Sequence, residues 1–345
     1  MDNFKPILEK LAQRQDLTPQ EARSALGGII SGDVGVERTS AFLLGMRSKG
    51  ETIEELTTFV EVMRDAAERP EVDVDGAVDL CGTGGDNLGT FNISTAAMFV
   101  VAGAGVPVLK HGNRSVSSKS GSADVLEALD IVATLHKEQI ERVFEEIQVS
   151  FMIAPNFHPT MKHVMPARQI LGIRSFFNTM GPLLNPAGVR RQVVGAFDNR
   201  TARQIAQILS NLDSERVYSV HSRDGLDEFS LTAPTFIHEI KNNEYVGEKE
   251  FNASSLGFSP VSLQDLQGGD RFYNAKIIRS VLEGEGEQAH RDIVLLNATF
   301  GIHVSGRADS LEQAKQMALE SIDSGAALKT MKRMSEATND IMESN

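Results

Sequence analysis

Apolar residues in the first 68 positions recur at the three- and four-residue spacing of helices. One such stripe consists of Phe4, Ile7, Leu8 and Leu11. Capping-box patterns begin two further helices at Thr18 and Thr52. We therefore expect a small all-helical domain over residues 1–68, joined by helices from about residue 160 to 185. A core of this size is marginal alone, so the domain should pack on another part of the molecule or on a second subunit.

A polar linker with one proline, residues 69–75, ends this helical region. Short apolar runs then alternate with helical patterns: strands are predicted at 78–81, 106–109, 151–154, 192–197 and 216–221, and helices at 92–103, 122–129, 137–149 and 201–212. Residues 229–250 are typical of antiparallel strands with a turn at Asn242-Asn243, and helices dominate from about residue 273. The pattern predicts a larger α/β domain over residues 76–345, with a central, mostly parallel sheet.

The stretch Cys81–Thr95, CGTGGDNLGTFNIST, lies between a predicted strand and a predicted helix. It holds four glycines, four Ser/Thr hydroxyls and one carboxylate, Asp86, but no lysine or arginine. Glycines let a ligand approach the backbone, and a helix N-terminus binds negative charge, so the pattern favours a phosphate site. Its spacing fits neither a Walker loop nor a dinucleotide-binding loop. The alternative is a tight turn before a capped helix.

The positive charge that the glycine-rich stretch lacks occurs after the next predicted strand, in Lys110–Ser122, KHGNRSVSSKSGS. This segment has three permanent cations, one histidine, five serines and no acid. Because neighbouring parallel strands place their following loops side by side, it should lie beside the glycine-rich stretch. A solvated basic loop is the alternative.

Two further segments carry candidate chemistry. Asp224–Glu228, DGLDE, follows a predicted strand, and adjacent carboxylates there can bind Mg²⁺; with 47 acidic residues in the chain, a solvated loop is the alternative. Residues 156–186 contain His158, His163, Arg168 and Arg174. Arginine offers a planar partner for a carboxylate or phosphate, whereas helix capping and surface histidines are the alternatives.

Composition narrows the class of protein. The chain has 345 residues and a net charge of −13, so it repels nucleic acid, and an anionic substrate must be held by local cations, backbone N–H groups or a metal. The single cysteine, Cys81, excludes an internal disulfide and fits a reducing compartment. The N-terminal segment has no apolar signal region and no apolar run is long enough to span a bilayer. We expect a cytoplasmic enzyme without membrane or nucleic-acid partners.

These motifs resemble those of the anthranilate phosphoribosyltransferases, which act in the second step of tryptophan biosynthesis. The matching segments are residues 82–86, 90–95, 110–129, 167–186 and 224–228, together with LTPQEA and KGETIEEL near the N-terminus. The resemblance covers nearly the whole chain; Cys81 and Ser222 depart from the residues common in the family, and residues 232–250 match little. GTGGD alone would not exclude the nucleoside phosphorylases, which share the fold.

The resemblance implies a hinge between the two domains, a homodimer formed through the helical domain, and a possible complex with anthranilate synthase. It implies that the chain transfers the phosphoribosyl group of phosphoribosyl pyrophosphate to anthranilate and releases pyrophosphate, with two Mg²⁺ ions.

By match to the family motifs, the phosphoribosyl pyrophosphate site would comprise Gly82, Gly85, Asp86, Thr90, Asn92, Ile93, Ser94, Thr95, Lys110, His111, Gly112, Asn113, Arg114, Ser115, Val116, Ser117, Ser118 and Ser122. The residues implied for anthranilate are Gly82, Asn113 and Arg168, with His111 and Pro182 as further lining of its channel, and those implied for Mg²⁺ are Ser94, Asp227 and Glu228.

No side-chain nucleophile is expected, because displacement of pyrophosphate needs stabilisation of the leaving group and an oriented amine rather than a covalent intermediate. His111 could accept a proton, although packing or hydrogen bonding is the commoner role of a single histidine. Two other readings stay open: a pyrimidine nucleoside phosphorylase, which would not require the acidic loop or a divalent metal, and a non-catalytic relative that binds nucleic acid, which the acidic net charge disfavours.

Overall fold

The computed structural model describes residues 4–86, 88–115 and 119–343. Within them, a seven-stranded sheet has the order β3-β2-β1-β4-β5-β6-β7. Its strands are β1 (Val78–Gly82), β2 (Val108–Gly112), β3 (Val149–Ile153), β4 (Arg191–Gly195), β5 (Arg216–Ser222), β6 (Thr235–Lys241) and β7 (Glu244–Phe251). Strands β1 to β5 pair in parallel, whereas β6 and β7 add an antiparallel edge.

The helices before β4 are α1 (Phe4–Ala12), α2 (Pro19–Ile30), α3 (Val36–Lys49), α4 (Ile53–Asp65), α5 (Ile93–Gly103), α6 (Ser122–Ala128), α7 (Lys137–Ile147), α8 (Ala154–Phe157), η1 (Pro159–His163), α9 (Met165–Leu171), α10 (Phe177–Met180) and η2 (Gly181–Leu183). Those after it are α11 (Asn199–Leu209), η3 (Ala253–Leu256), η4 (Leu263–Leu266), α12 (Arg271–Leu282), α13 (Gln288–Val304), α14 (Leu311–Asp323) and α15 (Ala326–Glu343).

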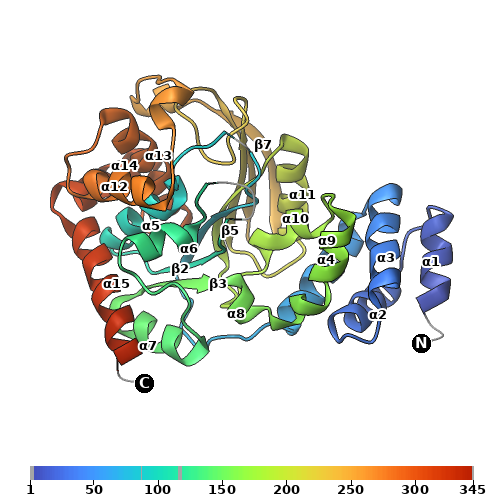
Figure 1. Cartoon of the computed structure of the whole chain (residues 1–345). Coiled ribbons are helices and arrows are strands. Elements are labelled where there is room, and N and C mark those ends of the chain that lie inside the picture. The colour runs from blue at the N-terminus through green and yellow to red at the C-terminus, as the bar shows by residue number, and fades with distance from the viewer. Residues whose placement is uncertain (1–3, 87, 116–118, 344–345) are drawn as a thin grey trace.

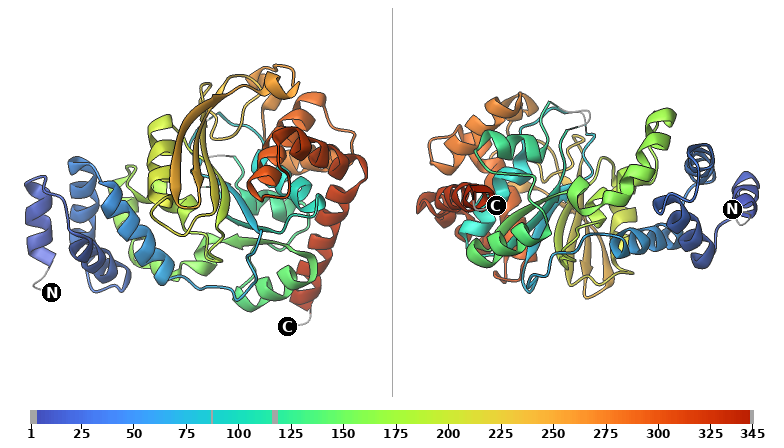
Figure 2. Two further views of the ribbon diagram at one scale, coloured as in Figure 1. Left: turned by 180° about the vertical axis from the view of Figure 1, so that it is seen from behind. Right: turned by 60° about the horizontal axis from the view of Figure 1, so that its bottom comes forward.

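Helices cover both faces of the sheet, and the N-terminal helices form a lobe at one end of the molecule, far from α15 (Figures 1 and 2). One large core joins Leu80 of β1 to α5 and to Phe300 of α13. A second core runs from Phe42 and Phe59 in the lobe through α11 to Val194 of β4. The small lobe therefore packs on the α/β part through shared apolar side chains, as expected for a helical unit too small to be stable alone.

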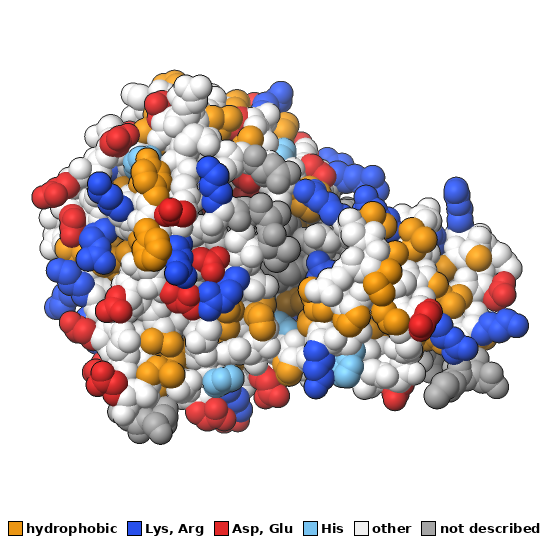
Figure 3. Space-filling model, viewed as in Figure 1, with side chains coloured by type: hydrophobic (Ala, Val, Ile, Leu, Met, Phe, Trp, Pro, Cys, Tyr) orange, Lys and Arg blue, Asp and Glu red, His pale blue; other side chains and the backbone are white. Residues whose placement is uncertain are grey.

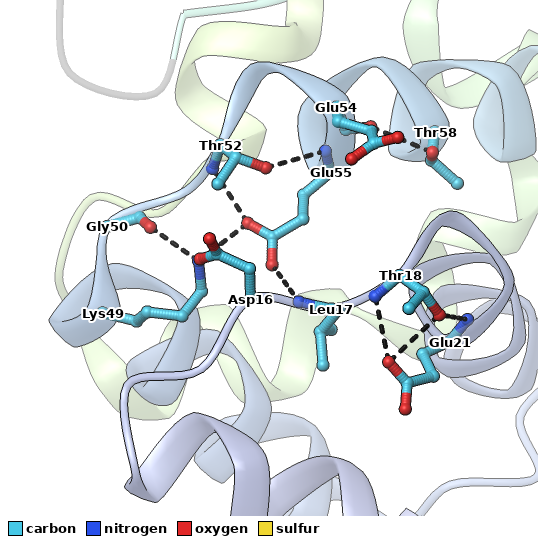
Figure 4. A network of polar contacts seen from close by, with 10 residues as sticks. All are labelled: Asp16, Leu17, Thr18, Glu21, Lys49, Gly50, Thr52, Glu54, Glu55 and Thr58. Atoms are coloured by element: carbon cyan, nitrogen blue, oxygen red, sulfur yellow. Dashed lines mark hydrogen bonds and ion pairs between the residues drawn. The ribbon is translucent and has the colours of Figure 1, made fainter.

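A buried carboxylate fixes the helices of this lobe to one another (Figure 4). Glu55 on α4 is 0% exposed and accepts hydrogen bonds from the Leu17 and Thr52 N–H groups, each at 2.8 Å. Its third partner is the Lys49 ammonium, also 2.8 Å away. Both predicted capping boxes, at Thr18 and Thr52, are confirmed. Glu55 thus combines a local cap with a long-range tie between α4 and the segment before α2.

The predicted fold class is confirmed, with corrections to element boundaries. The strand expected at 106–109 is wrong by two residues, because β2 starts at Val108 and pairs with β3 as far as Gly112. The strand expected at 151–154 begins earlier, at Val149, and ends at Ile153. The hairpin turn at Asn242-Asn243 is confirmed, with positive φ angles of 50° and 66°.

No helix among the described residues combines the length and apolarity needed to cross a membrane. The division into domains at residues 68 and 76, and the hinge between them, stay predictions.

Candidate active site

The glycine-rich stretch forms a loop from the end of β1 to the first turn of α5. Gly84, Gly85 and Gly89 have φ angles of 63°, 79° and 70°, a conformation that residues with side chains rarely adopt. The helix begins at Ile93 with Asn92 as its N-cap, although the Asn92 side chain makes no capping hydrogen bond. The expected order of strand, glycine loop and helix N-terminus is therefore present, but the side-chain amide of Asn92 does not cap the helix.

The DGLDE segment, Asp224–Glu228, follows β5 and contacts the glycine loop; we call this segment the acidic loop. The Gly84 N–H donates to Asp227 Oδ2 at 2.9 Å, and the Ser94 N–H donates to Glu228 Oε1 at 3.2 Å. The backbone of Asp227 also packs on β4 so closely that a Cβ on Gly195 would lie 1.6 Å from its carbonyl oxygen. Two carboxylates from a loop more than 130 residues later in the chain thus contact the glycine loop and the start of α5.

Three acids lie together in this place. Withdrawal from solvent, followed by the charge of Asp86, raises the pKa of Asp227 to about 7. Withdrawal from solvent, followed by the charge of Asp227, raises the pKa of Glu228 to about 8. Burial also raises the pKa of Asp86. The three pKa values are raised first by burial and then by the charges of neighbouring carboxylates, and a bound cation would relieve that repulsion.

The donor set fits Mg²⁺ on the condition that the substrate supplies some of the metal ligands. Among the described residues, no three His, Cys, Asp or Glu side chains are grouped so as to hold a metal ion by themselves. Mg²⁺, however, commonly takes only one or two protein carboxylates and completes its shell with water and substrate phosphates. Asp227, Glu228 and the Ser94 hydroxyl suit that arrangement, in which the substrate supplies the remaining ligands.

Lys110 supplies positive charge from inside the sheet rather than from a loop. It belongs to β2, is only 1% exposed, and its ammonium donates to the Leu80 carbonyl and, at 3.2 Å, to Ser94 Oγ. The ammonium also favours the charged form of Glu228, which lowers the pKa of that carboxyl against the effect of burial. The structure therefore places this cation beside the acids and the start of α5.

The rest of the basic segment is organised by α6. Arg114 pairs with Asp124 at 3.1 Å and with Glu127, so its guanidinium faces α6. Asp124 Oδ2 accepts from the N–H groups of Ser115 at 3.0 Å and Gly121 at 2.9 Å, which ties the two ends of the segment together.

The other candidate residues of this basic segment hold varied positions. Asn113 and Lys119 are exposed, and Ser122 is the first residue of α6 and lies against Gly112. Val116, Ser117 and Ser118 lie outside the described residues.

The two arginines of residues 156–186 take different positions. Arg174 donates to the Gly85 carbonyl at 3.0 Å and lies 4.5 Å from the centre of the Phe197 ring. Arg168 lies 5.6 Å from the Phe177 ring, and burial lowers its pKa. Of the two, only Arg174 contacts the glycine loop, a contact that sequence reasoning did not assign.

Asp79 is a second residue that sequence reasoning missed. It is fully buried in β1, where it accepts from the His111 N–H at 3.1 Å and from Asn185 Nδ2 at 2.8 Å. Because buried charges need partners, an acid inside the apolar run VDLC is the signal that could have identified it. Asp79 therefore joins β1, β2 and the segment after η2.

His111 is buried and neutral. Burial lowers its pKa to about 3, and its ring lies 5.5 Å from that of His158, whose Nε2 contacts the Leu184 carbonyl at 2.8 Å. A base of that pKa takes up a proton poorly near neutral pH. The position of His111 therefore fits packing and hydrogen bonding better than proton transfer.

We expect the neutral His111 to make the protein sensitive to acid. Its folded pKa of about 3 lies below the ordinary 6.5, so the unfolded chain binds this proton more readily than the folded protein. The free energy of unfolding is therefore at its full value above pH 6.5 and decreases as the pH falls towards the folded pKa. At pH 4 the loss amounts to up to about 3 kcal/mol. Thermal denaturation between pH 7 and 4 should show a shallower fall for His111→Gln than for the wild type. His136→Gln, at an exposed histidine, is the control and should follow the wild type; parallel curves for His111→Gln would contradict the prediction.

Comparison with known proteins is consistent with this site. Residues 5–67 match a glycosyl transferase family helical bundle domain, and residues 74–328 match a glycosyl transferase family a/b domain. Anthranilate phosphoribosyltransferases from Salinibacter ruber and Rhodopseudomonas palustris are each 45% identical, over 97% of this chain and 98% of the relative.

Solved structures agree in fold over the same extent. The crystal structure of the Thermus thermophilus anthranilate phosphoribosyltransferase is 34% identical with a TM-score of 0.90, covering 98% of this chain and 100% of that one. The Saccharomyces cerevisiae enzyme in complex with phosphoribosyl pyrophosphate and Mg is 25% identical with a TM-score of 0.89, covering 98% of each chain. Because these relatives match nearly the whole chain, this chain belongs to the anthranilate phosphoribosyltransferase family.

Proposed function

We propose that this chain transfers the phosphoribosyl group of phosphoribosyl pyrophosphate to the amino group of anthranilate, giving N-(5-phosphoribosyl)anthranilate and pyrophosphate. The observation that carries the proposal is the contact of Asp227 and Glu228 with Gly84 and Ser94, beside the buried Lys110. Such a site combines a cation for phosphate with carboxylates for a metal, at the N-terminus of a helix. Two relatives of 45% identity over nearly the full length carry the same activity in their names.

We assign Asp227, Glu228 and Ser94 as the residues that would hold Mg²⁺, in keeping with the Mg complex of the yeast relative. When bound, the metal neutralises charge on the pyrophosphate. The chain itself contributes the Lys110 charge at the start of α5, which would attract and orient the same phosphates. Binding of two ions, as the resemblance implies, stays a prediction.

The direct test is to follow anthranilate fluorescence with purified protein, phosphoribosyl pyrophosphate and Mg²⁺. Anthranilate should be consumed, and a chelator should stop the reaction until Mg²⁺ is restored. Consumption that continues in chelator would argue against the metal site. No consumption under any condition, with phosphorolysis of a pyrimidine nucleoside in its place, would overturn the proposed reaction.

Arg168 is proposed to orient anthranilate by pairing with its carboxylate. Its guanidinium is partly buried among apolar groups and lies against Phe177, so a bound carboxylate would compensate for its lost hydration. In Arg168→Ala we expect the Michaelis constant for anthranilate to rise about tenfold or more, since a charge-assisted bidentate pair is lost. The constant for phosphoribosyl pyrophosphate should change by less than about twofold.

Lys162→Ala, which removes an exposed cation from the same segment, is the matched control and should behave as wild type. Equal rises in both constants for Arg168→Ala would mean that the arginine supports the fold rather than anthranilate.

A homodimer through the helical lobe is supported by exposed apolar side chains on α3 and in and around α9. These are Leu44, Met165, Ile170 and Ile173, and hydrophobic side chains gather on this part of the surface in Figure 3. Because Ile170 is 70% exposed, Ile170→Lys should shift the protein from dimer towards monomer in light scattering. Val246→Lys, at a 62% exposed position on the sheet edge, should leave it a dimer. A wild-type monomer at all concentrations would refute this assembly. Cytoplasmic location and a complex with anthranilate synthase stay predictions.

A further inference from the structure

An asparagine on α12 is connected to the phosphate site through a row of amide hydrogen bonds. Asn274 is 2% exposed, and its Oδ1 accepts from the Gly269 N–H at 2.7 Å. Its Nδ2 donates to Asn92 Oδ1 at 3.0 Å, and Asn92 Nδ2 donates to the Ser120 carbonyl at 3.1 Å. We call these four residues the amide relay. It runs from the start of α12 through the N-cap of α5 to the end of the basic segment.

The direction of each hydrogen bond in the amide relay is set by its two ends. The Gly269 N–H can only donate, so Asn274 must turn its oxygen towards it and its NH₂ towards Asn92. Asn92 must then present its oxygen to Asn274, which leaves its NH₂ for the Ser120 carbonyl. Because that carbonyl can only accept, all three bonds agree, and no side-chain amide can be reversed without breaking two of them.

The α12 end of the amide relay is held firmly against the glycine loop. The Gly268 N–H donates to the Gly89 carbonyl at 2.8 Å, and the Phe91 N–H donates to the Leu266 carbonyl at 3.3 Å. A Cβ on Gly268 would lie 2.6 Å from the Phe91 nitrogen, so the two backbones are in direct contact. Asn274 is therefore fixed relative to one phosphate loop while it restrains the other.

We propose that Asn274 is a positioning residue for the phosphoribosyl pyrophosphate site, which acts through Asn92 to hold Ser120 and the basic segment beside the glycine loop. This inference rests on the function proposed above. The amide relay occupies both the oxygen and the NH₂ group of the Asn92 side chain, so in the ligand-free protein this side chain holds the parts of the site in position. Asn274 contacts the site only through that residue and the loop at 269.

The first test is Asn274→Asp, assayed at pH 8.5 so that the new carboxyl is ionised. It can still accept from Gly269 but cannot donate to Asn92, which must turn and then oppose the Ser120 carbonyl. The Michaelis constant for phosphoribosyl pyrophosphate should rise about tenfold, with less than about a twofold change for anthranilate. Ile278→Val, a buried change one turn further along α12, is the control for loosened packing and should leave both constants unchanged.

The second test is a double-mutant cycle with Asn274→Ala and Asn92→Ala. If Asn274 acts through Asn92, its substitution should add nothing once Asn92 is alanine, so the effects on the phosphoribosyl pyrophosphate constant will not add. Additive effects, or equal changes for both substrates, would overturn the proposal.

Hydrogen exchange separates this proposal from the enzymatic function. In ligand-free protein, peptides containing Ser115 and Gly121 should exchange faster in both Asn274 variants than in wild type or Ile278→Val, whether or not anthranilate is consumed. Unchanged exchange there would refute the positioning role even in an active enzyme. Faster exchange in a protein that consumes no anthranilate would support the amide relay and leave only the proposed reaction refuted.

Discussion

Asp227→Asn is expected to lower the rate of anthranilate consumption at least about 100-fold, because a metal ligand at such a site is worth several kcal/mol. The amide oxygen can still accept the Gly84 N–H, so the loop should keep its place while the negative charge is lost. Activity should recover partly at high Mg²⁺, and initial rates measured against Mg²⁺ concentration would show this as a raised apparent constant for the metal.

Stability should move in the opposite direction from activity. The charges of Asp227 and Asp86 oppose each other, and the Asp227 charge raises the pKa of Glu228. Removing one of these charges should leave the melting temperature of the metal-free variant unchanged or higher. A large fall in melting temperature would show that Asp227 is needed for folding rather than for the metal.

Asp224→Asn is the matched control, since it removes the same charge from the same loop. Asp224 accepts from Ser230 Oγ at 2.5 Å and from the Thr232 hydroxyl, whereas the Gly84 N–H donates to Asp227, and an amide at position 224 can still accept one of these bonds. Its activity should stay within about threefold of wild type, as for a charge outside the metal shell. Equal losses in both variants would mean that net charge, not ligation, explains the effect.

The parts of the fold that depend on near neighbours were predictable from the sequence. The capping boxes at Thr18 and Thr52 each need residues only three positions apart. The turn at Asn242-Asn243 follows from the ease with which asparagine adopts positive φ. The order of strand, glycine loop and helix at residues 78–103 also followed, because its signals are contiguous.

The side-chain partners within the site were not predictable in the same way. Arg168 and Arg174 lie six positions apart, and nothing in their spacing indicates that only Arg174 reaches Gly85, 89 residues earlier. Lys110 was expected to be the first residue of a loop. Pairing with β3 instead extends β2 through Lys110, whose side chain is buried. Such outcomes depend on strand register and on long-range packing, which local periodicity does not encode.

Gly195→Ala is expected to abolish most activity although Gly195 contacts no proposed substrate. An alanine Cβ would lie 1.6 Å from the Asp227 carbonyl oxygen and 2.6 Å from its carbonyl carbon. β4 cannot yield easily, because Gly195 pairs with Gly82 on one side and Val220 on the other. The acidic loop must therefore move, and a displacement of about 1 Å at a catalytic group costs on the order of 100-fold in rate. Overpacking should also destabilise the protein by about 1–3 kcal/mol.

Gly27→Ala on α2 is the matched control, since nothing beyond the neighbouring backbone of its own helix lies within 4 Å of the added Cβ. It should keep full activity and gain about 0.5–1 kcal/mol in stability, because alanine restricts the unfolded chain and favours a helix. Rates and urea unfolding of the two variants together separate the steric effect from the loss of a glycine. Added Mg²⁺ should not restore Gly195→Ala, in contrast to Asp227→Asn, because displacement moves Glu228 together with its neighbour. Wild-type activity in Gly195→Ala would show that the acidic loop can shift without consequence, and its assignment to the metal would then fail.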